Sequence, residues 1–323
     1  MRNHLSILVT LGLLAAACST SKSSPSNDAG GGKSTAPVPV ASTTSASVSI
    51  APPTAAEAAL VANRPYLLRP PAQAEASKPL PLIVLLHGYG ATASWFDDKT
   101  KMKESADQER FVAAIPDGTP DSKGKRFWNA TDACCNFDKK DVDDAAYLRA
   151  LIKDASARAP VDPKRIYIVG YDNGGFLAHR AACELSDIVA GVVSVGGAGW
   201  LDPTRCTTKG PVSILQVHGD NDQTVAYGGG RVKWMADAPE HPGARQTVAD
   251  WAKRNGCGPN TSPMPSVNLD DDLAGAETIV ERYNGCERGA VELWTRRAKK
   301  HQIGTGLKAM HLYTEFLLSH PKR

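Results

Sequence analysis

The residues whose type and spacing suggest chemistry most directly lie in the turn Gly-Tyr-Asp-Asn-Gly-Gly, residues 170–175. A short run rich in β-branched residues (166–170) leads into this turn, and a segment that favours a helix follows it at once. This is the layout of a nucleophile elbow, in which Gly-x-Ser-x-Gly joins a strand to a helix. Small residues are needed there because the strained turn brings the strand and helix backbones close together. The central position, where serine is usual, holds Asp172, so the reactive atom on offer is a carboxylate oxygen.

Two further residues complete a catalytic order along the chain. Asp222 ends the run His-Gly-Asp-Asn-Asp directly after a predicted strand, and His301 follows the next predicted strand. The order of nucleophile position, acid and histidine is that of α/β-hydrolases. An earlier loop, His-Gly-Tyr-Gly, occupies the place that supplies one oxyanion donor, which we assign to the Tyr89 amide. The amide of Asn173, directly after the elbow residue, is the predicted second donor.

Apolar runs alternate with segments of helical periodicity over most of the chain. Residues 141–157 space their apolar side chains as an amphipathic helix does. The predicted strands are short and apolar, and they span residues 82–86, 111–116, 166–170, 190–195, 212–217 and 291–295. Apolar strands separated by helices indicate an α/β fold, with a mostly parallel sheet covered by helices on both faces. Asp172, Asp222 and His301 are therefore expected at the carboxyl ends of strands, where reactive groups of such sheets collect.

The first residues predict export from the cytoplasm. Residues 1–18 comprise a short positive region, an apolar run and small residues, which is typical of a secretory signal and too short for a spanning helix. Ala-Ala-Ala-Cys at its end resembles a bacterial lipobox, so we predict lipid attachment at Cys18; the alternative is ordinary signal cleavage that removes Cys18. Residues 19–62 are rich in Ser, Thr, Ala, Pro and Gly and predict a disordered stalk. The interpretation is a secreted protein or a cell-envelope lipoprotein of a bacterium, which meets the membrane only through its lipid.

The rest of the chain, residues 63–323, is predicted to form one domain. An irregular excursion is expected at about 227–290, where periodicity is weak and Pro and Gly are frequent. The formal net charge of +3 is small, so nothing in the charge balance favours nucleic acid as a partner.

Six cysteines follow the lipobox, and an even number in an oxidising compartment indicates disulfides before metals. Cys257 and Cys286 bracket part of the excursion and are expected to pair. Cys134 and Cys135 are not expected to bond each other, because a bridge between neighbours forces an unusual backbone. Each is expected to reach one of the two remaining cysteines, Cys183 and Cys206. No two cysteines have the spacing of a zinc ribbon, so no metal is expected.

Several motifs together resemble one family. They are Leu-His-Gly-Tyr-Gly (86–90), Phe-Trp-Asn-Ala (127–130), the adjacent cysteines, Val-Asp-Asp (142–144), Val-Asp-Pro-Lys-Arg-Ile-Tyr (161–167), the elbow, and His-Gly-Asp-Asn-Asp (218–222). The combination is similar to secreted polyhydroxybutyrate depolymerases and feruloyl or acetylxylan esterases. The resemblance implies an α/β-hydrolase fold that hydrolyses carboxylic esters without a cofactor, on a substrate that can be polymeric, such as a polyester or a plant-wall phenolic ester. It assigns the nucleophile position to Asp172, the acid to Asp222 and the base to His301, with Trp128 and Asn129 as candidates for an aromatic-ester pocket.

Two departures from that family fall at the chemistry. Asp172 replaces the serine, and the histidine loop, usually Gly-Gly-Gly-His-x-Trp-Pro-Gly, reads Ala-Lys-Lys-His-Gln-Ile-Gly-Thr-Gly (298–306). If a carboxylate added to an ester, the tetrahedral species would expel the better leaving group. That group is the aspartate, whose acid has a pKa of about 3.9, and not an alcohol, whose pKa is close to water's roughly 15.7. Two carboxylates around His301 would also keep its imidazolium protonated near neutrality and withhold it as a base.

Three functions follow as alternatives. The first is a carboxylic-ester hydrolase of the depolymerase or feruloyl esterase type, impaired by Asp172. The second is a non-catalytic relative that binds an ester or a polysaccharide. The third is an aspartate-nucleophile hydrolase that attacks an alkyl carbon, because the elbow also resembles that of haloalkane dehalogenases and epoxide hydrolases. Their oxyanion loop usually reads His-Gly-x-Pro, however, and here Gly90 stands in place of the proline.

Overall fold

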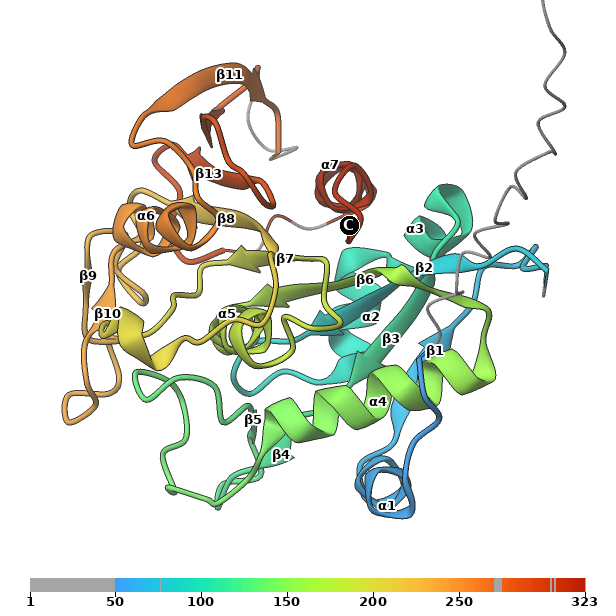
Figure 1. Cartoon of the computed structure of the whole chain (residues 1–323). Helices are drawn as coiled ribbons and strands as arrows, with labels where there is room; N and C mark the ends of the chain where they lie inside the picture. Colours follow the sequence, from blue (N-terminus) through green and yellow to red (C-terminus); the bar gives the residue numbers. More distant parts are fainter. Residues whose placement is uncertain (1–49, 76, 270–274, 303, 305, 323) are drawn as a thin grey trace, which may run out of the picture. The chain divides into compact units, whose positions relative to one another are not determined.

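The computed structural model describes residues 50–322 except 76, 270–274, 303 and 305. Within this part of the chain, nine strands form one sheet: β1 (Tyr66–Arg69), β2 (Leu80–Leu86), β3 (Val112–Pro116), β6 (Val161–Tyr171), β7 (Gly191–Val195), β8 (Ser213–Gly219), β11 (Thr261–Val267), β12 (Thr278–Tyr283) and β13 (Val291–Arg296). Their order is β1-β3-β2-β6-β7-β8-β13-β12-β11 (Figure 1). The strands from β3 to β13 are parallel, and antiparallel strands extend both edges. The predicted α/β class with a mostly parallel sheet is confirmed.

Helices cover both faces of the sheet. They are α1 (Ala55–Asn63), α2 (Ala93–Thr100), α3 (Met102–Glu109), α4 (Asp144–Arg158), α5 (Asn173–Glu184), α6 (Ala244–Arg254) and α7 (Leu307–Leu318), with a 3-10 turn η1 (Pro203–Arg205). Alternate side chains of β2 separate the two layers. Leu82 and Val84 join the core formed with α4 and α5, whereas Ile83 and Leu85 join the core formed with α2, α3 and α7. Because side chains on both faces are buried, the strands read as continuous apolar runs in the sequence.

Two small ladders lie outside this sheet. They pair β4 (Thr119–Pro120) with β5 (Arg126–Phe127), and β9 (Gly229–Gly230) with β10 (His241–Pro242).

The structure differs from the predicted stalk at its C-terminal end, residues 50–62. Residues from 55 onward form α1, which begins at a capping box of Thr54 and Glu57: each side chain accepts a hydrogen bond from the other residue's amide. Glu57 also pairs with Lys153 of α4 at 2.7 Å. The alanine-rich composition that suggested a stalk also has high helix propensity, and packing on α4 stabilises the helix.

The predicted signal with Cys18, and the predicted stalk up to residue 49, lie outside the described residues. Among the residues that the structure does describe, none of the helices has the length and apolar character needed to cross a bilayer.

The predicted irregular excursion at 227–290 contains more regular structure than expected. It carries α6, which packs on β8 and β13, and it adds the antiparallel strands β11 and β12 to the sheet. Helix α6 buries one face, at a helical spacing that spans only 11 residues of a segment rich in Pro and Gly: Ala244, Thr247, Val248, Trp251 and Ala252. Strand β11 contains two prolines, and it lies at the sheet edge, where strands tolerate proline.

The disulfides agree with the prediction for one pair and correct it for the others. Cys257 and Cys286 pair as expected. Cys183 of α5 bonds Cys206, the residue directly after η1, and their Cα atoms are 5.2 Å apart. The adjacent residues Cys134 and Cys135 bond each other, and the peptide bond between them is cis. The proximity of α5 and η1 is a tertiary contact, which spacing in the sequence does not reveal.

Candidate active site

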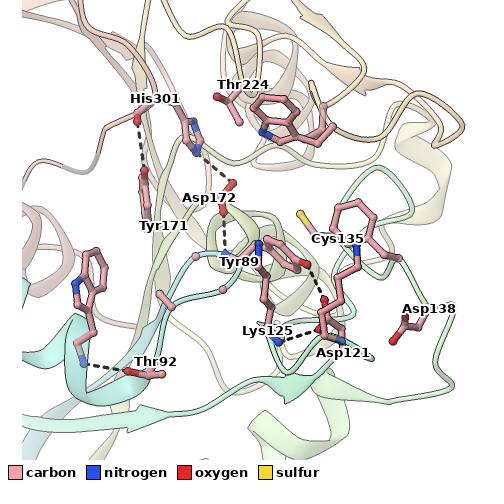
Figure 2. Close-up of a pocket in the computed structure, with 18 of the residues that line it drawn as sticks. Tyr89, Thr92, Asp121, Lys125, Cys135, Asp138, Tyr171, Asp172, Thr224 and His301 are labelled. Atoms are coloured by element: carbon pink, nitrogen blue, oxygen red, sulfur yellow. Dashed lines mark hydrogen bonds and ion pairs between the residues drawn. The ribbon is translucent and has the colours of Figure 1, made fainter.

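The residues predicted to act together lie at the carboxyl ends of parallel strands. Asp172 follows β6, Asp222 follows β8, His301 follows β13, and Tyr89 follows β2. Figure 2 shows the side chain of Asp172 between His301 and the amide of Tyr89. The structure therefore brings these four residues to one place.

Asp172 joins β6 to α5 in the strained conformation that an elbow requires. Its φ is 53° and its ψ is −120°, a region that residues with a side chain rarely adopt. The helix lies so close to β2 that a Cβ on Gly174 would stand 2.3 Å from the carbonyl oxygen of Leu86. A Cβ on Gly170 would stand 2.1 Å from the carbonyl oxygen of Gly174. The glycines of the motif are therefore required by backbone contact.

The two carboxylate oxygens of Asp172 have different partners. Oδ2 accepts a hydrogen bond from the Tyr89 amide at 2.9 Å, and Oδ1 lies 3.2 Å from Nε2 of His301. The Tyr89 amide is the predicted oxyanion donor, and in this structure it already binds an anion of its own chain. One side chain thus contacts both the histidine and the oxyanion donor.

His301 lies between two carboxylates. Its Nδ1 is 2.6 Å from Oδ2 of Asp222, and its Nε2 faces Asp172. Burial lowers the pKa of His301, but hydrogen bonds with Asp172 and Asp222 and the charges of both carboxylates outweigh it and raise the pKa to about 9. The ring stacks on Tyr171, with centroids 5.3 Å apart. At neutral pH both ring nitrogens carry protons, so His301 has no lone pair to accept another.

Asp222 is held by the turn that follows β8. Its Oδ1 accepts hydrogen bonds from the amides of Thr224 at 2.8 Å and Val225 at 3.0 Å. Burial raises the pKa of Asp222, but hydrogen bonds with His218 and His301 outweigh this effect and hold the pKa well below the usual carboxyl range. Asp222 is therefore a permanently charged partner of His301.

A buried chain of hydrogen bonds continues from Asp222 into the core. The indole N–H of Trp251 donates to Nδ1 of His179 at 3.1 Å, and Nε2 of His179 lies 2.8 Å from the side-chain oxygen of Gln216. Because an indole can only donate, Nδ1 of His179 accepts and Nε2 carries the proton. The nitrogen of Gln216 then donates to Nδ1 of His218 at 3.1 Å, and Nε2 of His218 donates to the carbonyl oxygen of Val225 at 2.8 Å, with Oδ2 of Asp222 3.4 Å away. The chain of donors therefore ends at the Val225 carbonyl oxygen beside Asp222. Burial lowers the pKa of His179 to about 4, so that this histidine is neutral.

A cavity of about 1030 Å³ opens beside Asp172 and His301. Aromatic rings form much of its wall: Tyr89, Trp95, Phe137, Tyr171 and Trp234. An aromatic wall beside reactive groups suits a ligand with a planar or apolar portion. Within the described part of the chain, no group of three or more His, Cys, Asp or Glu side chains could hold a metal ion.

The structure corrects the choice of Trp128 and Asn129 as pocket residues. Trp128 is fully buried, and its indole N–H donates to the carbonyl oxygen of His87 at 2.9 Å. Its backbone amide and carbonyl bond the side chain of Asn173 at 2.6 and 3.0 Å. Trp128 therefore ties the loop after β2 to the start of α5, where the Asn173 amide lies. Asn129 donates to the carbonyl oxygen of Val142 at 2.8 Å and is not among the residues that line this cavity.

Sequence reasoning missed the aromatic residues at the mouth of the cavity. Trp95 lies in the first turn of α2, Phe137 follows the adjacent cysteines, and Trp234 follows β9. Their exposed fractions are 44%, 42% and 68%. Phe137 and Trp234 lie in segments with many Gly, Pro or polar residues and no helical or strand periodicity. Their position in the sequence could have identified them. An aromatic side chain in an irregular segment has few core residues to pack against, so it is a candidate for contact with a ligand.

The sequence pattern of the phospholipase/carboxylesterase family matches residues 70–233, which include β2, the elbow and Asp222. The chain belongs to this family. Solved structures agree on the fold. Esterase PE8 has a TM-score of 0.51 and 14% identity over 80% of this chain and 99% of its own. The acetyl xylan esterase from Aspergillus awamori has a TM-score of 0.54 and 12% identity over 79% of this chain and 94% of its own. The predicted α/β-hydrolase fold is confirmed.

Curated proteins similar to this family member include esterases and a depolymerase. Feruloyl esterase B of Piromyces equi is 28% identical over 261 residues, which are 79% of this chain and 46% of that protein. Poly(3-hydroxyalkanoate) depolymerase C of Paucimonas lemoignei is 23% identical over 154 residues, which are 46% of this chain and 34% of that protein. The chain spans less than half the length of these relatives. The predicted resemblance is confirmed at the level of an esterase family of α/β-hydrolases.

Proposed function

We propose that this chain is a carboxylic-ester hydrolase of the feruloyl esterase or polyhydroxybutyrate depolymerase type, whose turnover is slow because Asp172 stands at the serine position. Family membership, the esterase relatives and the aromatic cavity beside His301 support the ester as substrate. Asp222 and His301 are proposed as the acid and base of the parent mechanism, with the Tyr89 and Asn173 amides as oxyanion donors.

The observation that carries the proposal of slow turnover is the pair of contacts made by Asp172. An elbow serine presents its hydroxyl to the histidine and leaves the oxyanion donors to the substrate. Here Oδ1 faces His301 and Oδ2 accepts the hydrogen bond of the Tyr89 amide. A substrate oxyanion must therefore displace the enzyme's own carboxylate from that amide.

In the proposed ester hydrolysis, water attacks the ester carbon directly. Covalent attack by Asp172 would give a tetrahedral species that expels the aspartate and returns to substrate. In the water route, Asp172 takes a proton as the water oxygen bonds to the ester carbon, and the imidazolium of His301 gives its proton to the departing alcohol. A proton passing from Asp172 to His301, over 3.2 Å, restores the resting state. This route has general acid and base catalysis but no covalent intermediate.

A second candidate is displacement at an alkyl carbon, favoured by the hydrogen bond between Tyr89 and Oδ2. If Oδ1 of Asp172 displaced a leaving group from an sp³ carbon, the new ester would already have its carbonyl oxygen against an oxyanion donor. The aspartate would also have lost its charge, which lowers the pKa of His301 and frees it to take a proton from water. Attack of that water at the aspartyl carbon would release the alcohol and restore Asp172.

The test compares the wild-type protein with Asp172→Ser and Asp172→Ala, with Asp98→Ser of α2 as an exposed control. Each is given a nitrophenyl ester, methyl ferulate, and a panel of haloalkanes and epoxides. We expect slow ester turnover in the wild type and a rise of about 100-fold or more in Asp172→Ser. The serine opens the covalent route and leaves the Tyr89 amide to the substrate, and one oxyanion donor contributes about that much. Melting temperatures check that each variant is folded.

Three outcomes contradict the main proposal in different ways. Ester turnover only in Asp172→Ser would make the wild-type chain a non-catalytic, ester-binding relative. Rapid wild-type ester cleavage that Asp172→Ser does not improve would refute the leaving-group argument. Turnover of alkyl substrates alone, with ¹⁸O from labelled water found in Asp172, would establish the second candidate.

We also propose that the chain acts outside the cytoplasm as a lipoprotein anchored at Cys18. The three disulfides of the described residues support an oxidising compartment, and the lipobox-like run supports the anchor. Mass spectrometry of the mature N-terminus decides the point. A diacylated Cys18 supports the anchor, whereas a mature chain that begins beyond it rules the anchor out.

A further inference from the structure

The oxyanion donor Tyr89 is held by its side chain as well as by its backbone. Its amide donates to Oδ2 of Asp172 at 2.9 Å, and its hydroxyl donates to Oδ2 of Asp121 at 2.6 Å. Figure 2 shows both bonds, with Asp172 above Tyr89 and Asp121 at the far end of its ring. One residue therefore links the reactive centre to a carboxylate outside the group of Asp172, Asp222 and His301.

Asp121 is fixed within the turn between β4 and β5. Its exposed fraction is 7%, and its Oδ1 accepts hydrogen bonds from the amides of Lys123 and Lys125, both at 2.8 Å. The hydrogen bond from Tyr89 outweighs the effect of burial and holds the pKa of Asp121 below the usual carboxyl range. Burial and the same hydrogen bond raise the pKa of the Tyr89 hydroxyl. At neutral pH the pair is therefore a carboxylate and an O–H donor, and such charge-assisted hydrogen bonds are stronger than neutral ones.

The peptide unit that carries the donor amide is also held at its carbonyl edge. The amide of Gly118 donates to Nε2 of His87 at 2.9 Å, so this nitrogen accepts and Nδ1 of His87 carries the proton. Nδ1 then donates to the carbonyl oxygen of Gly88 at 2.8 Å. Burial lowers the pKa of His87, so the ring is neutral at neutral pH. This bond orients the donor amide, because the Gly88 carbonyl and the Tyr89 amide belong to one planar unit.

The loop itself adds little stiffness at this point. Glycines flank Tyr89 on both sides, and Gly90 has a φ of 78°. A Cβ on Gly88 would lie 3.0 Å from Oδ2 of Asp172, so this position favours glycine. Because glycine restricts the backbone least, the loop can shift its donor amide at low cost unless other contacts hold it. The side chain of Tyr89 supplies such a contact through Asp121.

We propose that Asp121 is a positioning residue of the oxyanion hole, which holds the Tyr89 amide in place for a substrate oxyanion through its hydrogen bond with the Tyr89 hydroxyl. The inference rests on the proposed ester hydrolase, which gives the amide its role. The hairpin of β4 and β5 is the fixed support, because the Gly90 amide also donates to the carbonyl oxygen of Arg126 at 2.8 Å. Asp121 itself takes no part in the reaction.

Three substitutions separate this role from a general effect on the fold. Tyr89→Phe removes only the hydroxyl, and it keeps the backbone amide and the ring that packs on Phe137 with centroids 5.1 Å apart. Asp121→Asn keeps an acceptor oxygen for the amides of the turn and removes the charge. Tyr66→Phe is the matched control, since it removes a hydroxyl that donates to Oδ2 of Asp154 at 2.7 Å, between β1 and α4. Melting temperatures establish that each variant is folded.

The first measurement is hydrogen exchange at the amide of residue 89, followed by NMR on the full chain. We expect Tyr89→Phe to speed this exchange about tenfold or more, the usual effect of one hydrogen bond to a charged group. Asp121→Asn should act in the same direction. The double variant should exchange no faster than Tyr89→Phe, because both changes remove the same bond. Tyr66→Phe should leave exchange at residue 89 unchanged.

The second measurement uses a trifluoromethyl ketone as an oxyanion mimic in Asp172→Ser. The serine Oγ bonds to the ketone carbon, His301 takes the serine proton, and the ketone oxygen becomes the anion that the donor amides bind. Adding Tyr89→Phe should raise the inhibition constant about tenfold. It should leave the KM for a nitrophenyl ester nearly unchanged, because the donor acts on the oxyanion more than on the bound ester. Adding Tyr66→Phe should change neither constant.

Exchange at residue 89 or an inhibition constant that Tyr89→Phe leaves unchanged would overturn the inference. Equal effects of Tyr66→Phe and Tyr89→Phe would do the same, since they would indicate a general loosening of the fold. The two proposals fail separately, because exchange is measured without a substrate. Faster exchange in Tyr89→Phe with no ester turnover in any variant refutes the hydrolase and keeps the restraint on the amide. Ester turnover in Asp172→Ser with unchanged exchange does the reverse.

Discussion

Replacing Asp172 by asparagine removes one of the two charges that keep His301 protonated and preserves the size of the side chain. Oδ1 of Asp172 lies 3.2 Å from Nε2 of His301, and Asp222 lies 2.6 Å from Nδ1. We expect Asp172→Asn to bring the pKa of His301 down toward neutrality, because only one carboxylate then opposes the effect of burial.

The size of the fall follows from the balance of effects on His301. Its pKa of about 9, against an ordinary 6.5, is what remains after burial has lowered it, so the two carboxylates together raise it by more than about 2.5. Both carboxylates contribute through a hydrogen bond and through their charge. Removing Asp172 should therefore lower the pKa of His301 by roughly 1 or more, which corresponds to roughly 1–2 kcal/mol of interaction with the imidazolium.

The same pKa predicts how the stability of the fold depends on pH. Because the folded-state pKa of His301 is above its unfolded value of 6.5, the ion pairs stabilise the fold fully below about pH 6.5. This contribution is lost as the pH rises through about 9. The free energy of unfolding contributed by His301 should fall by about 3 kcal/mol over that window. In Asp172→Asn the loss should be smaller and should be complete at a lower pH than in the wild type.

Histidine resonances titrated by NMR give the pKa directly, with His301→Gln to assign the signal. Urea unfolding at pH 6, 7.5 and 9.5 gives the stability. Asp98→Asn, which alters an exposed carboxylate of α2, should change neither measurement. A wild-type His301 that titrates below pH 7, or a pKa that Asp172→Asn leaves unchanged, would refute the reasoning from the two carboxylates.

Two further predictions concern the support of the site. Gln216→Leu removes the link between two buried histidines and should lower the free energy of unfolding by about 2–4 kcal/mol in urea denaturation, because each histidine loses a partner. In the wild type, ¹⁵N shifts should place the proton of His179 on Nε2. A proton on Nδ1 would contradict the assigned direction of the hydrogen bonds. Gly174→Ala places a Cβ 2.3 Å from a carbonyl oxygen, so we expect a loss of about 3 kcal/mol or failure to fold. Gly228→Ala has nothing within 4 Å of the new Cβ and is the matched control; equal melting temperatures of the two variants would show that the elbow tolerates the contact.

The features that the sequence predicted correctly are those set by local requirements. The elbow could be recognised in the sequence because α5 approaches β2 so closely that position 174 has no room for a side chain and must be glycine. The buried strands could be recognised because helices cover both faces of the sheet, so that successive residues of each strand are apolar. Asp172, Asp222 and His301 could be placed together since each follows a parallel strand, and the carboxyl ends of such strands share one edge.

The features that the sequence did not predict depend on contacts between distant segments. Trp128 lies next to a loop and could face a cavity or the core with equal ease; its contact with Asn173 settles the matter only in three dimensions. The bond between Cys183 and Cys206 requires η1 to lie on α5, and no spacing rule contains that contact. Helix α6 was missed although its buried residues recur at helical spacing, because it is only 11 residues long and lies within a segment rich in Pro and Gly.

The elbow carboxylate can be assigned to one of two reactions by the protonation of His301. The scaffold holds the Tyr89 amide and His301 around residue 172, so any aspartate there acquires both partners, and their presence alone does not separate the reactions. Water attack on an ester uses the imidazolium to protonate the alcohol, so turnover should fall as the pH passes about 9. The alkyl route needs a neutral imidazole after Asp172 has lost its charge, so its hydrolytic step should quicken as the pH rises through the lowered pKa of His301. The direction of the pH profile thus distinguishes the two reactions. The ion pair of Asp172 with protonated His301 assists ester hydrolysis, whereas the alkyl route requires that this ion pair be broken.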